Sequence, residues 1–186
     1  MPPAIRKARA VAGANLVLRD IEEQDAQFVF DLRTDPVKSR HLSATSGRVE
    51  DQVEWIRGYR DKADQAYFIV CDKAGKRLGC IRMYDPVGGR YSWGSWLMVN
   101  GLSPLVSMES ALLIYAYGKW LGFDEARIDV RQDNQSVWRF HEKFSRAELV
   151  GETEIDRVYV VGKDSIDAML RKYANLLTDP LKVEGA

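Results

Sequence analysis

A histidine stands inside an apolar helical stripe toward the end of the sequence. Val137, Phe140, His141 and Phe144 recur at helical spacing, so His141 occupies a place that a leucine would ordinarily fill. Imidazole can exchange a proton near neutral pH, because its unperturbed pKa is ~6.5 and burial or neighbours can shift that pKa. His141 is therefore either a catalytic proton donor or a hydrogen-bonded core histidine.

A candidate anion site precedes this helix. Residues 91–99 are rich in aromatic and β-branched side chains, which predicts a strand, and Asn100-Gly101 then predicts a turn. A helix follows, with Ser103 or Ser107 as its cap and Pro104 suited to its first position. The first amides of a helix lack partners within the helix and lie at its positive end. Backbone amides at this helix start can therefore hold a pyrophosphate.

After this helix the sequence predicts a strand at 126–133 and a helix that begins at Asn134. This order of strands and helices resembles the GCN5-related N-acetyltransferase (GNAT) superfamily. The residues that carry the resemblance are Leu121-Gly122-Phe123, Val130 with Asp133-Asn134, and His141-Glu142-Lys143-Phe144. The last run stands where the family usually has tyrosine, glutamate, lysine and leucine. The chain departs from the family at the pyrophosphate loop, where the family's arginine or glutamine and two small residues, usually glycines, fall near Leu102, Leu105 and Ser107 and neither glycine is present. It also departs at Ser145-Arg146, which replaces a glycine-phenylalanine pair.

The resemblance implies that acetyl-coenzyme A is the acetyl donor. It places the thioester carbonyl against backbone amides near Leu97, Met98 and Val99, which would stabilise the oxyanion. The residues that it places around the pyrophosphate are Pro104, Leu105, Val106, Ser107 and Met108.

The resemblance also gives roles to the last helix. Asn134 would bond the pantetheine amides or simply cap the helix. Arg139 and Lys143 would meet the adenosine phosphates or remain surface charges. His141 stands at the position of the family's tyrosine, which implies that it protonates the leaving thiolate.

No general base is evident from the sequence. The strand at 91–99 contains no carboxylate, although family members often carry one there. Glu109, Glu152 and a water held by Ser92 or Ser95 are the alternatives. Glu109 is explained equally well as an acidic residue near the start of its helix, where the dipole favours it.

The acceptor site is predicted from polar and aromatic residues elsewhere. Arg40 and His41 lie in a polar segment between two helices, which in this family commonly lines the acceptor site. Arg82 could meet a diphosphate, and Tyr84 and Trp93 could offer flat faces to a sugar or base.

Over residues 16–161 the chain resembles a branch of the family that acetylates amino groups of nucleotide-linked deoxysugars. The similar runs are His41-Leu-Ser43, Gln52 to Trp55, Tyr67-Phe68, Ile81 to Tyr84, Trp93 to Trp96 and Glu109 to Leu112. This predicts acetyl transfer to a nucleotide-linked amino sugar, as in cell-surface glycan synthesis. The alternatives are an N-acetyltransferase for protein N-termini or small amines, and a non-catalytic module that binds acyl-coenzyme A.

Composition predicts one globular domain over residues 1–186. Apolar residues make up 46% of the chain, and 27 basic residues balance 27 acidic ones, which argues against nucleic-acid or membrane partners. No apolar run is long enough to span a membrane and no secretory signal is evident, so we expect a cytoplasmic protein. Cys71 and Cys80, which could be cross-strand neighbours, are expected to be buried thiols. The two histidines and two cysteines lack the spacing of metal ligands, which argues against a metal site. The sequence does not decide whether the protein forms a homodimer.

The predicted fold class is α+β (α/β), with a mixed, mostly antiparallel sheet of about seven strands that splays at the cofactor site and is flanked by helices. Residues 1–15 are expected to be a frayed lead-in. The predicted strands are 16–21, 66–71, 78–84, 91–99, 126–133, 148–151 and 157–161. The predicted helices are 22–34, 49–64, 103 or 107 to 121, 134–144 and a C-terminal helix at 164–177.

Overall fold

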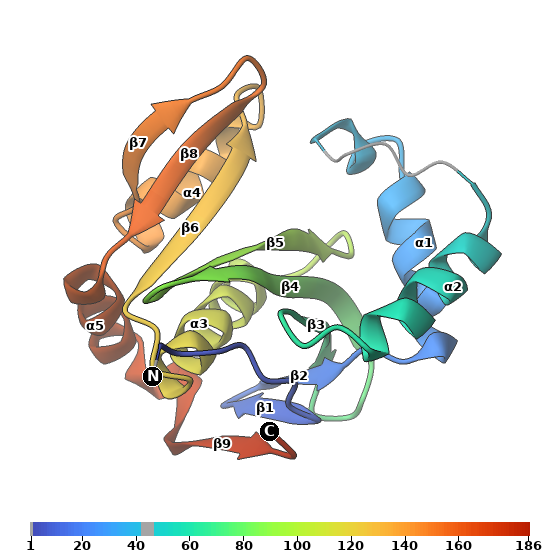
Figure 1. Ribbon diagram of the computed structural model, residues 1–186, viewed down its shortest axis with the longest axis horizontal. Helices are drawn as coiled ribbons and strands as arrows, with labels where there is room; N and C mark the ends of the chain where they lie inside the picture. The colour runs from blue at the N-terminus through green and yellow to red at the C-terminus, as the bar shows by residue number, and fades with distance from the viewer. Residues whose placement is uncertain (1, 42–46) are drawn as a thin grey trace.

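The computed structural model describes residues 2–41 and 47–186, and the part described is built on one sheet of nine strands (Figure 1). The strands are β1 (Ala10–Gly13), β2 (Leu16–Asp20), β3 (Ala66–Asp72), β4 (Arg77–Val87), β5 (Arg90–Met98), β6 (Glu125–Arg131), β7 (Glu148–Glu152), β8 (Asp156–Val161) and β9 (Leu177–Glu184). Their order across the sheet is β7-β8-β6-β5-β4-β3-β2-β1-β9. Only β5 and β6 are parallel neighbours, so the predicted mixed, mostly antiparallel sheet is confirmed.

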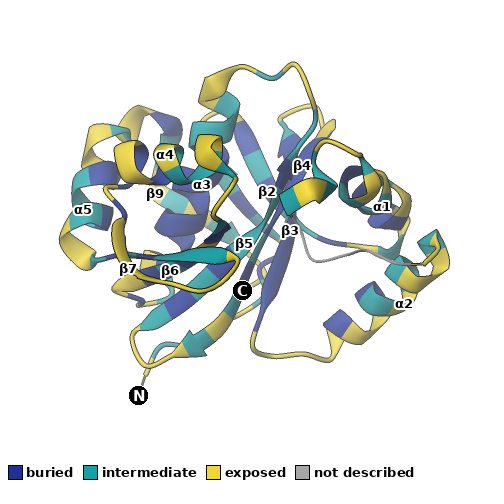
Figure 2. Ribbon diagram, turned by 90° about the horizontal axis from the view of Figure 1, so that it is seen from above, coloured by how far each residue is buried: buried dark blue, intermediate teal, exposed yellow. Residues whose placement is uncertain are grey.

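Helices lie on both faces of this sheet. They are α1 (Ala26–Thr34), α2 (Val49–Arg60), α3 (Pro104–Trp120), α4 (Gln135–Phe144) and α5 (Lys163–Lys172), with short 3-10 turns η1 (Glu23–Asp25), η2 (Ser39–His41) and η3 (Ala174–Leu176). Side chains of β3 alternate between two apolar clusters: Phe68 and Val70 pack on the α3 side, whereas Tyr67 and Ile69 pack with α1 and α2. Figure 2 shows β3 buried along its length between these layers. No helix of the described residues is long and apolar enough to cross a bilayer.

The sheet opens between β5 and β6, its two parallel strands. β5 pairs with β6 only from Arg90 to Ser92, and beyond that point the two strands diverge (Figure 1). On its other edge, β5 pairs with β4 with a register shift between Cys80 and Arg82, and Ser95 has a positive φ of 48°. The extra residue is a β-bulge, which bends β5 away from β6. The predicted splay is therefore present, and it exposes one edge of β5.

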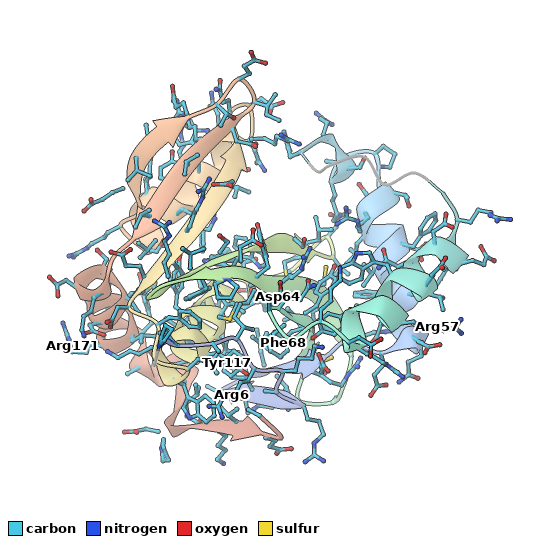
Figure 3. All side chains as sticks on the ribbon, in the orientation of Figure 1. Arg6, Arg57, Asp64, Phe68, Tyr117 and Arg171 are labelled. Atoms are coloured by element: carbon cyan, nitrogen blue, oxygen red, sulfur yellow. The ribbon has the colours of Figure 1, made fainter. Side chains whose placement is uncertain are left out.

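The segment predicted to be a frayed lead-in is instead part of the core. β1 pairs with β2, and Ile5 and Ala8 are buried. The hydroxyl of Tyr117 on α3 donates to the carbonyl of Arg6, and the Tyr117 ring meets Phe68 edge to face at 5.7 Å (Figure 3). The lead-in prediction was wrong because small residues carry no clear periodicity.

The C-terminal region also differs from its prediction. The helix expected at 164–177 ends at Lys172, and β9 follows and pairs with β1 at the sheet edge. β1 and β9 raise the strand number from about seven to nine. The helix expected at 49–64 ends at Arg60. Cys71 and Cys80 are buried free thiols, as expected, but Cys80 lies opposite Ile69 and Cys71 opposite Arg77, so the two are not cross-strand neighbours.

Candidate active site

A narrow cavity of about 110 Å³ occupies the opening between β5 and β6, and we call it the slot. Its lining residues come from both faces of the sheet. They are Lys38, His41, Trp93, Gly94, Ser95, Trp96, Leu97, Ile128, Asp129, Val130, Arg131, Asn134, Val137 and His141. Because the two strands no longer pair here, the slot connects the α3 and α4 side of the sheet with the α1 side. A reaction between two substrates that approach from opposite faces fits this geometry.

His141 reaches the slot from the buried face of α4. Its side chain is 1% exposed, and its ring lies 5.2 Å from Trp93 and 5.9 Å from Trp96 between ring centroids. Burial lowers the pKa of the imidazole to about 3, because the charged form is poorly solvated there. Among the described residues its Nδ1 has no hydrogen-bond partner. His141 is thus a neutral ring at pH 7 with an unused nitrogen.

One edge of β5 carries donors that no strand uses. The N–H of Val99 donates to the carbonyl of Leu78 on β4 at 2.8 Å, so the Val99 amide is not available as predicted. Successive backbone N–H groups of a strand point to opposite edges, so the N–H of Met98 points toward the opening beside β6. Since β6 has already diverged, Met98 is the predicted oxyanion donor that the geometry supports best.

The start of α3 is open, and its cap is Ser103 rather than Ser107. Ser103 Oγ accepts from the amide of Leu105 at 3.3 Å, and the Ser103 carbonyl accepts from Val106 at 3.0 Å. Pro104 occupies the first helical position, as predicted, and has no N–H to offer an anion. Leu105 is 58% exposed, so side chains do not block the helix end. An anion here must share the amides of Leu105 and Val106 with Ser103, and Ser107 and Met108 line the next turn.

Asn134 stands between β6 and α4 and lines the slot. Its side chain makes no capping hydrogen bond to the helix backbone, and its Oδ1 accepts from Ser136 Oγ at 3.3 Å. The structure therefore does not use the Asn134 side chain as a helix cap, which leaves its amide facing the slot.

A second cavity of about 270 Å³ lies between α3, α4 and α5. Its lining residues are Met108, Arg139, Phe140, Lys143, Phe144 and Tyr173. The structure thus brings together Met108, Arg139 and Lys143, which the sequence placed at the cofactor. Tyr173, which directly follows α5, also lines this cavity, and no sequence signal linked it to the site.

On the α1 side of the sheet, Arg82 is held between aromatic rings. Its guanidinium carbon lies 5.3 Å from the centroid of Trp55 and 4.8 Å from that of Tyr84. Arg82 Nε donates to Oε1 of the buried Gln65 at 2.8 Å. The structure brings Arg82 and Tyr84 together as predicted for an acceptor site, and adds Trp55 and Gln65. We call these four residues the Arg82 stack.

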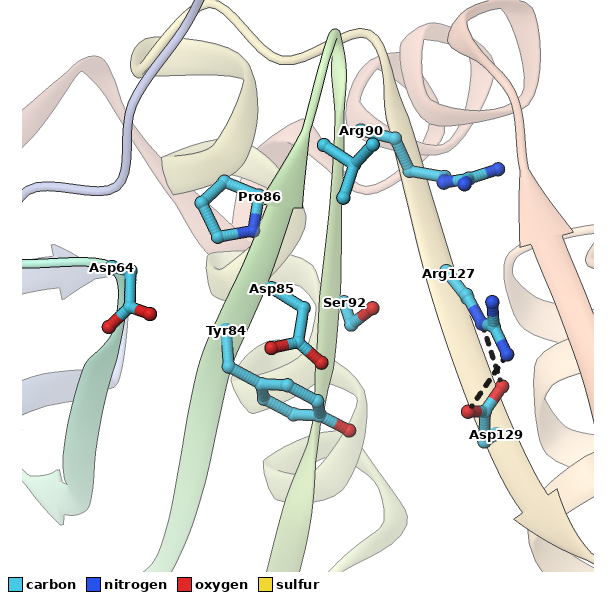
Figure 4. Close-up of a pocket in the computed structure, with 9 residues that line it drawn as sticks. Asp64, Tyr84, Asp85, Pro86, Arg90, Ser92, Arg127 and Asp129 are labelled. Carbon is cyan, nitrogen blue, oxygen red and sulfur yellow. Dashed lines mark hydrogen bonds and ion pairs between the residues drawn. The ribbon is translucent and has the colours of Figure 1, made fainter.

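A wider cavity of about 540 Å³ adjoins Tyr84, and we call it the outer cavity (Figure 4). It is lined by Asp64, Tyr84, Asp85, Pro86, Val87, Arg90, Ser92, Arg127 and Asp129. Its volume lies within the range of small-molecule sites. Asp129 lines both this cavity and the slot, so the two spaces adjoin at this residue.

Of the remaining predicted acceptor residues, His41 and Trp93 line the slot, whereas Arg40 does not. His41 lines the slot, with its Nδ1 3.1 Å from Oδ1 of Asp133. Arg40 is exposed and lines none of the cavities above. Trp93 lines the slot as well, but it is only 1% exposed and packs edge to face on Tyr115 at 5.5 Å, so little of its flat face is open. Leu42 and Ser43 of the His41 run lie outside the described residues.

The candidate general bases lie in different parts of the structure, and only some of them line a cavity. Glu109 is 2% exposed and its carboxylate accepts from the amides of Asn15 and Leu16 at 2.7 and 2.8 Å, so it holds the start of β2. Glu152 pairs with Arg157 on the β7–β8 hairpin and lines none of the three cavities. Ser92 and Ser95 do line the outer cavity and the slot.

Comparisons with known proteins agree with this geometry. Residues 15–145 match a family model described as an acetyltransferase (GNAT) domain. No curated protein matches the chain at a significant level. Among solved structures, apo FdhC, described as a nucleotide-linked sugar GNAT, is 28% identical with a TM-score of 0.81, covering 91% of this chain and 98% of that one.

Two further structures share the fold at lower identity. A probable acetyltransferase from Chromobacterium violaceum is 16% identical, with a TM-score of 0.78 and coverage of 90% of this chain and 92% of that one. Spermidine N-acetyltransferase from Vibrio cholerae, in complex with CoA and spermine, is 13% identical, with a TM-score of 0.70 and coverage of 81% and 97%. Because the family model matches well over half of the chain, this protein belongs to the GNAT acetyltransferases and is an N-acetyltransferase with acetyl-coenzyme A as its donor.

Proposed function

We propose that the enzyme acetylates the amino group of a nucleotide-linked amino sugar. The observation that carries the proposal is the similarity to FdhC, a nucleotide-linked sugar GNAT, at 28% identity over nearly the whole of both chains. The Arg82 stack supports it independently. A guanidinium between two rings can meet a diphosphate, and the rings beside it can stack on a base.

The donor side of the reaction is served by groups on α3, α4 and β5. Acetyl-coenzyme A supplies an activated acetyl thioester. The amides of Leu105 and Val106 at the start of α3 would bind its pyrophosphate, and Arg139 and Lys143 its adenosine phosphates. The N–H of Met98 would donate to the thioester carbonyl and stabilise the oxyanion as it develops.

His141 would stabilise the negative charge that develops on the leaving sulfur. Its ring is neutral, so it serves as a hydrogen-bond donor rather than a standing imidazolium. An anion that develops beside the ring favours its protonated form and raises its pKa. The buried ring thus acts on the thiolate only when the thiolate forms.

A panel assay tests the acceptor class. We expect free thiol to appear when the protein is incubated with acetyl-coenzyme A and a nucleotide-linked amino sugar, and far less with N-terminal peptides or spermidine. Arg82→Ala should raise KM for the nucleotide sugar at least tenfold, because the diphosphate loses its charged partner. Arg171→Ala is the control, since Arg171 is an exposed arginine on α5. Preference for spermidine over every nucleotide sugar would overturn the proposal.

A polyamine is the second candidate. Asp64, Asp85 and Asp129 line the outer cavity, and three carboxylates suit a multiply charged amine. Arg90 and Arg127 line the same cavity and reduce its negative charge, so we place this candidate behind the nucleotide sugar.

A further inference from the structure

Asp129 lies on the opposite side of the slot from His141. Along β6 the side chains alternate, so Ile128 and Val130 enter the apolar cluster on the α3 side. Asp129 therefore points to the other face, where the outer cavity lies (Figure 4). It is two residues beyond the last β6 residue that pairs with β5, which puts it at the point where the slot opens.

The Asp129 carboxylate is oriented by its own strand. Arg127 Nε donates to Oδ1 at 3.0 Å, and Arg127 Nη2 donates to Oδ2 at 3.3 Å. The two side chains are 40% and 41% exposed, so solvent can reach the carboxylate. Each carboxylate oxygen can accept more than one hydrogen bond, which leaves Asp129 able to accept from a ligand in the slot. Exposure also screens the charge of Arg127, so the pair is a weak one that a ligand can share.

We propose that Asp129 receives the acceptor amine and takes its first proton. This inference rests on the N-acetyltransferase activity and not on the identity of the sugar. An alkyl ammonium gives one proton to Asp129, which passes it to solvent. The free amine then attacks the acetyl carbonyl carbon, so a C–N bond forms and the C–S bond breaks. The second excess proton of the nitrogen ends on the sulfur, and one proton is released overall.

Other carboxylates near the acceptor side are placed less well. Asp64 and Asp85 line the outer cavity but not the slot. Asp133 is engaged by His41. The charged and titratable groups around Asp129 are Arg127 and Arg131 on β6, Tyr84 and Asp85 on β4, Arg90 on β5, Asp64 before β3, Lys38 and His41 near η2, and His141 on α4. Among the carboxylates of the described residues, only Asp129 lines both cavities.

The strand itself provides a matched control. Glu125 lies on β6 four residues before Asp129, on the same face by strand alternation, and lines neither cavity. Asp129→Asn and Glu125→Gln each replace a carboxylate by an amide of the same size. Asp129→Glu restores the carboxylate with a longer side chain. All three changes are on the surface side of β6, so we expect unchanged Tm values.

The test measures kcat/KM against pH with the amine that the wild-type enzyme acetylates best. For Asp129→Asn we expect a loss of about 10²–10⁴-fold at pH 7. The loss should shrink as pH rises toward the pKa of the amine, because free amine then no longer needs a base. Glu125→Gln should match the wild type, Asp129→Glu should recover at least tenfold, and binding of coenzyme A should be unchanged in all variants.

Three outcomes separate the hypotheses. The role of Asp129 would be overturned if kcat/KM of Asp129→Asn stayed within threefold of the wild-type value. It would also be overturned if Glu125→Gln lost as much kcat/KM as Asp129→Asn. If the wild type acetylates spermidine or a peptide but no nucleotide sugar, the proposed acceptor fails while Asp129 is still tested on the amine that reacts. Failure to acetylate any amine would overturn both.

Discussion

The ring of His41 reaches across the mouth of the slot to Asp133, with Nδ1 3.1 Å from Oδ1. The two residues are 92 positions apart in the sequence, one on η2 after α1 and the other after β6. Lys38 Nζ makes a second bridge to Asn100 Oδ1 at 2.6 Å. The segment after α1 is thus tied to both sides of the opening, to the loop after β5 and to the loop after β6.

We expect His41→Ala to raise KM for the acceptor by roughly threefold to tenfold with little effect on stability. The His41 side chain is 24% exposed and that of Asp133 is 74% exposed, and exposed pairs contribute only about 0.2–1 kcal/mol. Steady-state kinetics and a thermal melt check this. Asp133→Asn should give the same change, and the double variant should be no worse than either single one. Fully additive effects on KM would mean that the pair does not act as a unit.

Replacement of His141 by phenylalanine should remove chemistry and keep the fold. Phenylalanine can fill the space beside Trp93, Trp96 and Phe140, but it cannot donate to sulfur. We expect kcat to fall by about 10²–10⁴-fold with the Kd of coenzyme A nearly unchanged. Single-turnover kinetics and calorimetry measure the two quantities. Turnover at the wild-type rate would make His141 a core residue only.

The buried imidazole also makes stability depend on pH. The pKa of His141 is lowered to about 3 in the folded state, whereas the unfolded chain has the ordinary value of 6.5. Below pH 6.5 the unfolded chain therefore binds more protons, and stability is lost as pH falls toward 3. At pH 5 the loss is about 2 kcal/mol. Thermal melts of the wild type and His141→Phe from pH 7 to 5 should diverge by this amount, and parallel curves would contradict the prediction.

Glu109 is expected to matter for stability and not for catalysis. Its carboxylate accepts three hydrogen bonds, from the amides of Asn15 and Leu16 and from Asn15 Nδ2 at 2.8 Å. Glu109→Ala leaves the buried amide of Leu16 and the two partly buried donors of Asn15 without this partner, which should lower the free energy of unfolding by about 1–3 kcal/mol. Below its new Tm, the variant should retain wild-type kcat. A loss of kcat with unchanged Tm would return Glu109 to the list of candidate bases.

Gly118 marks the closest approach of α3 to β5. A Cβ there would lie 2.4 Å from the ring of Tyr91, which is itself buried and bonded to the carbonyl of Ile114. We expect Gly118→Ala to lower stability by about 1–3 kcal/mol through overpacking. Gly58→Ala on α2 is the control, because nothing lies within 4 Å of its Cβ and alanine should add up to about 1 kcal/mol. Chemical denaturation of both variants measures the two changes in the free energy of unfolding, which should have opposite signs.

The sequence predicted the elements that have strong periodicity and missed those whose signal is weak. All seven predicted strands form, but β1 was missed because Ala10–Gly13 contains small residues, and β9 because Asp179-Pro180 argues against a strand. Both lie at or next to the sheet edge, where proline is tolerated.

The strength of the sequence signal also explains which residues of the candidate site were predicted. His141 was found because a polar ring in an apolar stripe is conspicuous. Asp129 was missed because its strand was interpreted from Ile128 and Val130, and an alternating carboxylate is typical of a solvated face. Trp93 was misplaced because the face that it presents depends on packing against Tyr115 and His141. Nothing in the sequence marks these contacts.

The bulge at Ser95 decides toward which face of the sheet each half of β5 directs its side chains. Before it, Tyr91 and Trp93 face the α3 side, whereas after it Leu97 faces the α1 side although it has the same parity. Deleting one residue from 94–96 would therefore restore a regular ladder, in which Leu97 still faces Cys80 and the later side chains keep their faces, but the bend that carries β5 away from β6 would be lost. In this enzyme the one extra residue, more than the identity of its side chain, keeps the N–H of Met98 unpaired beside β6.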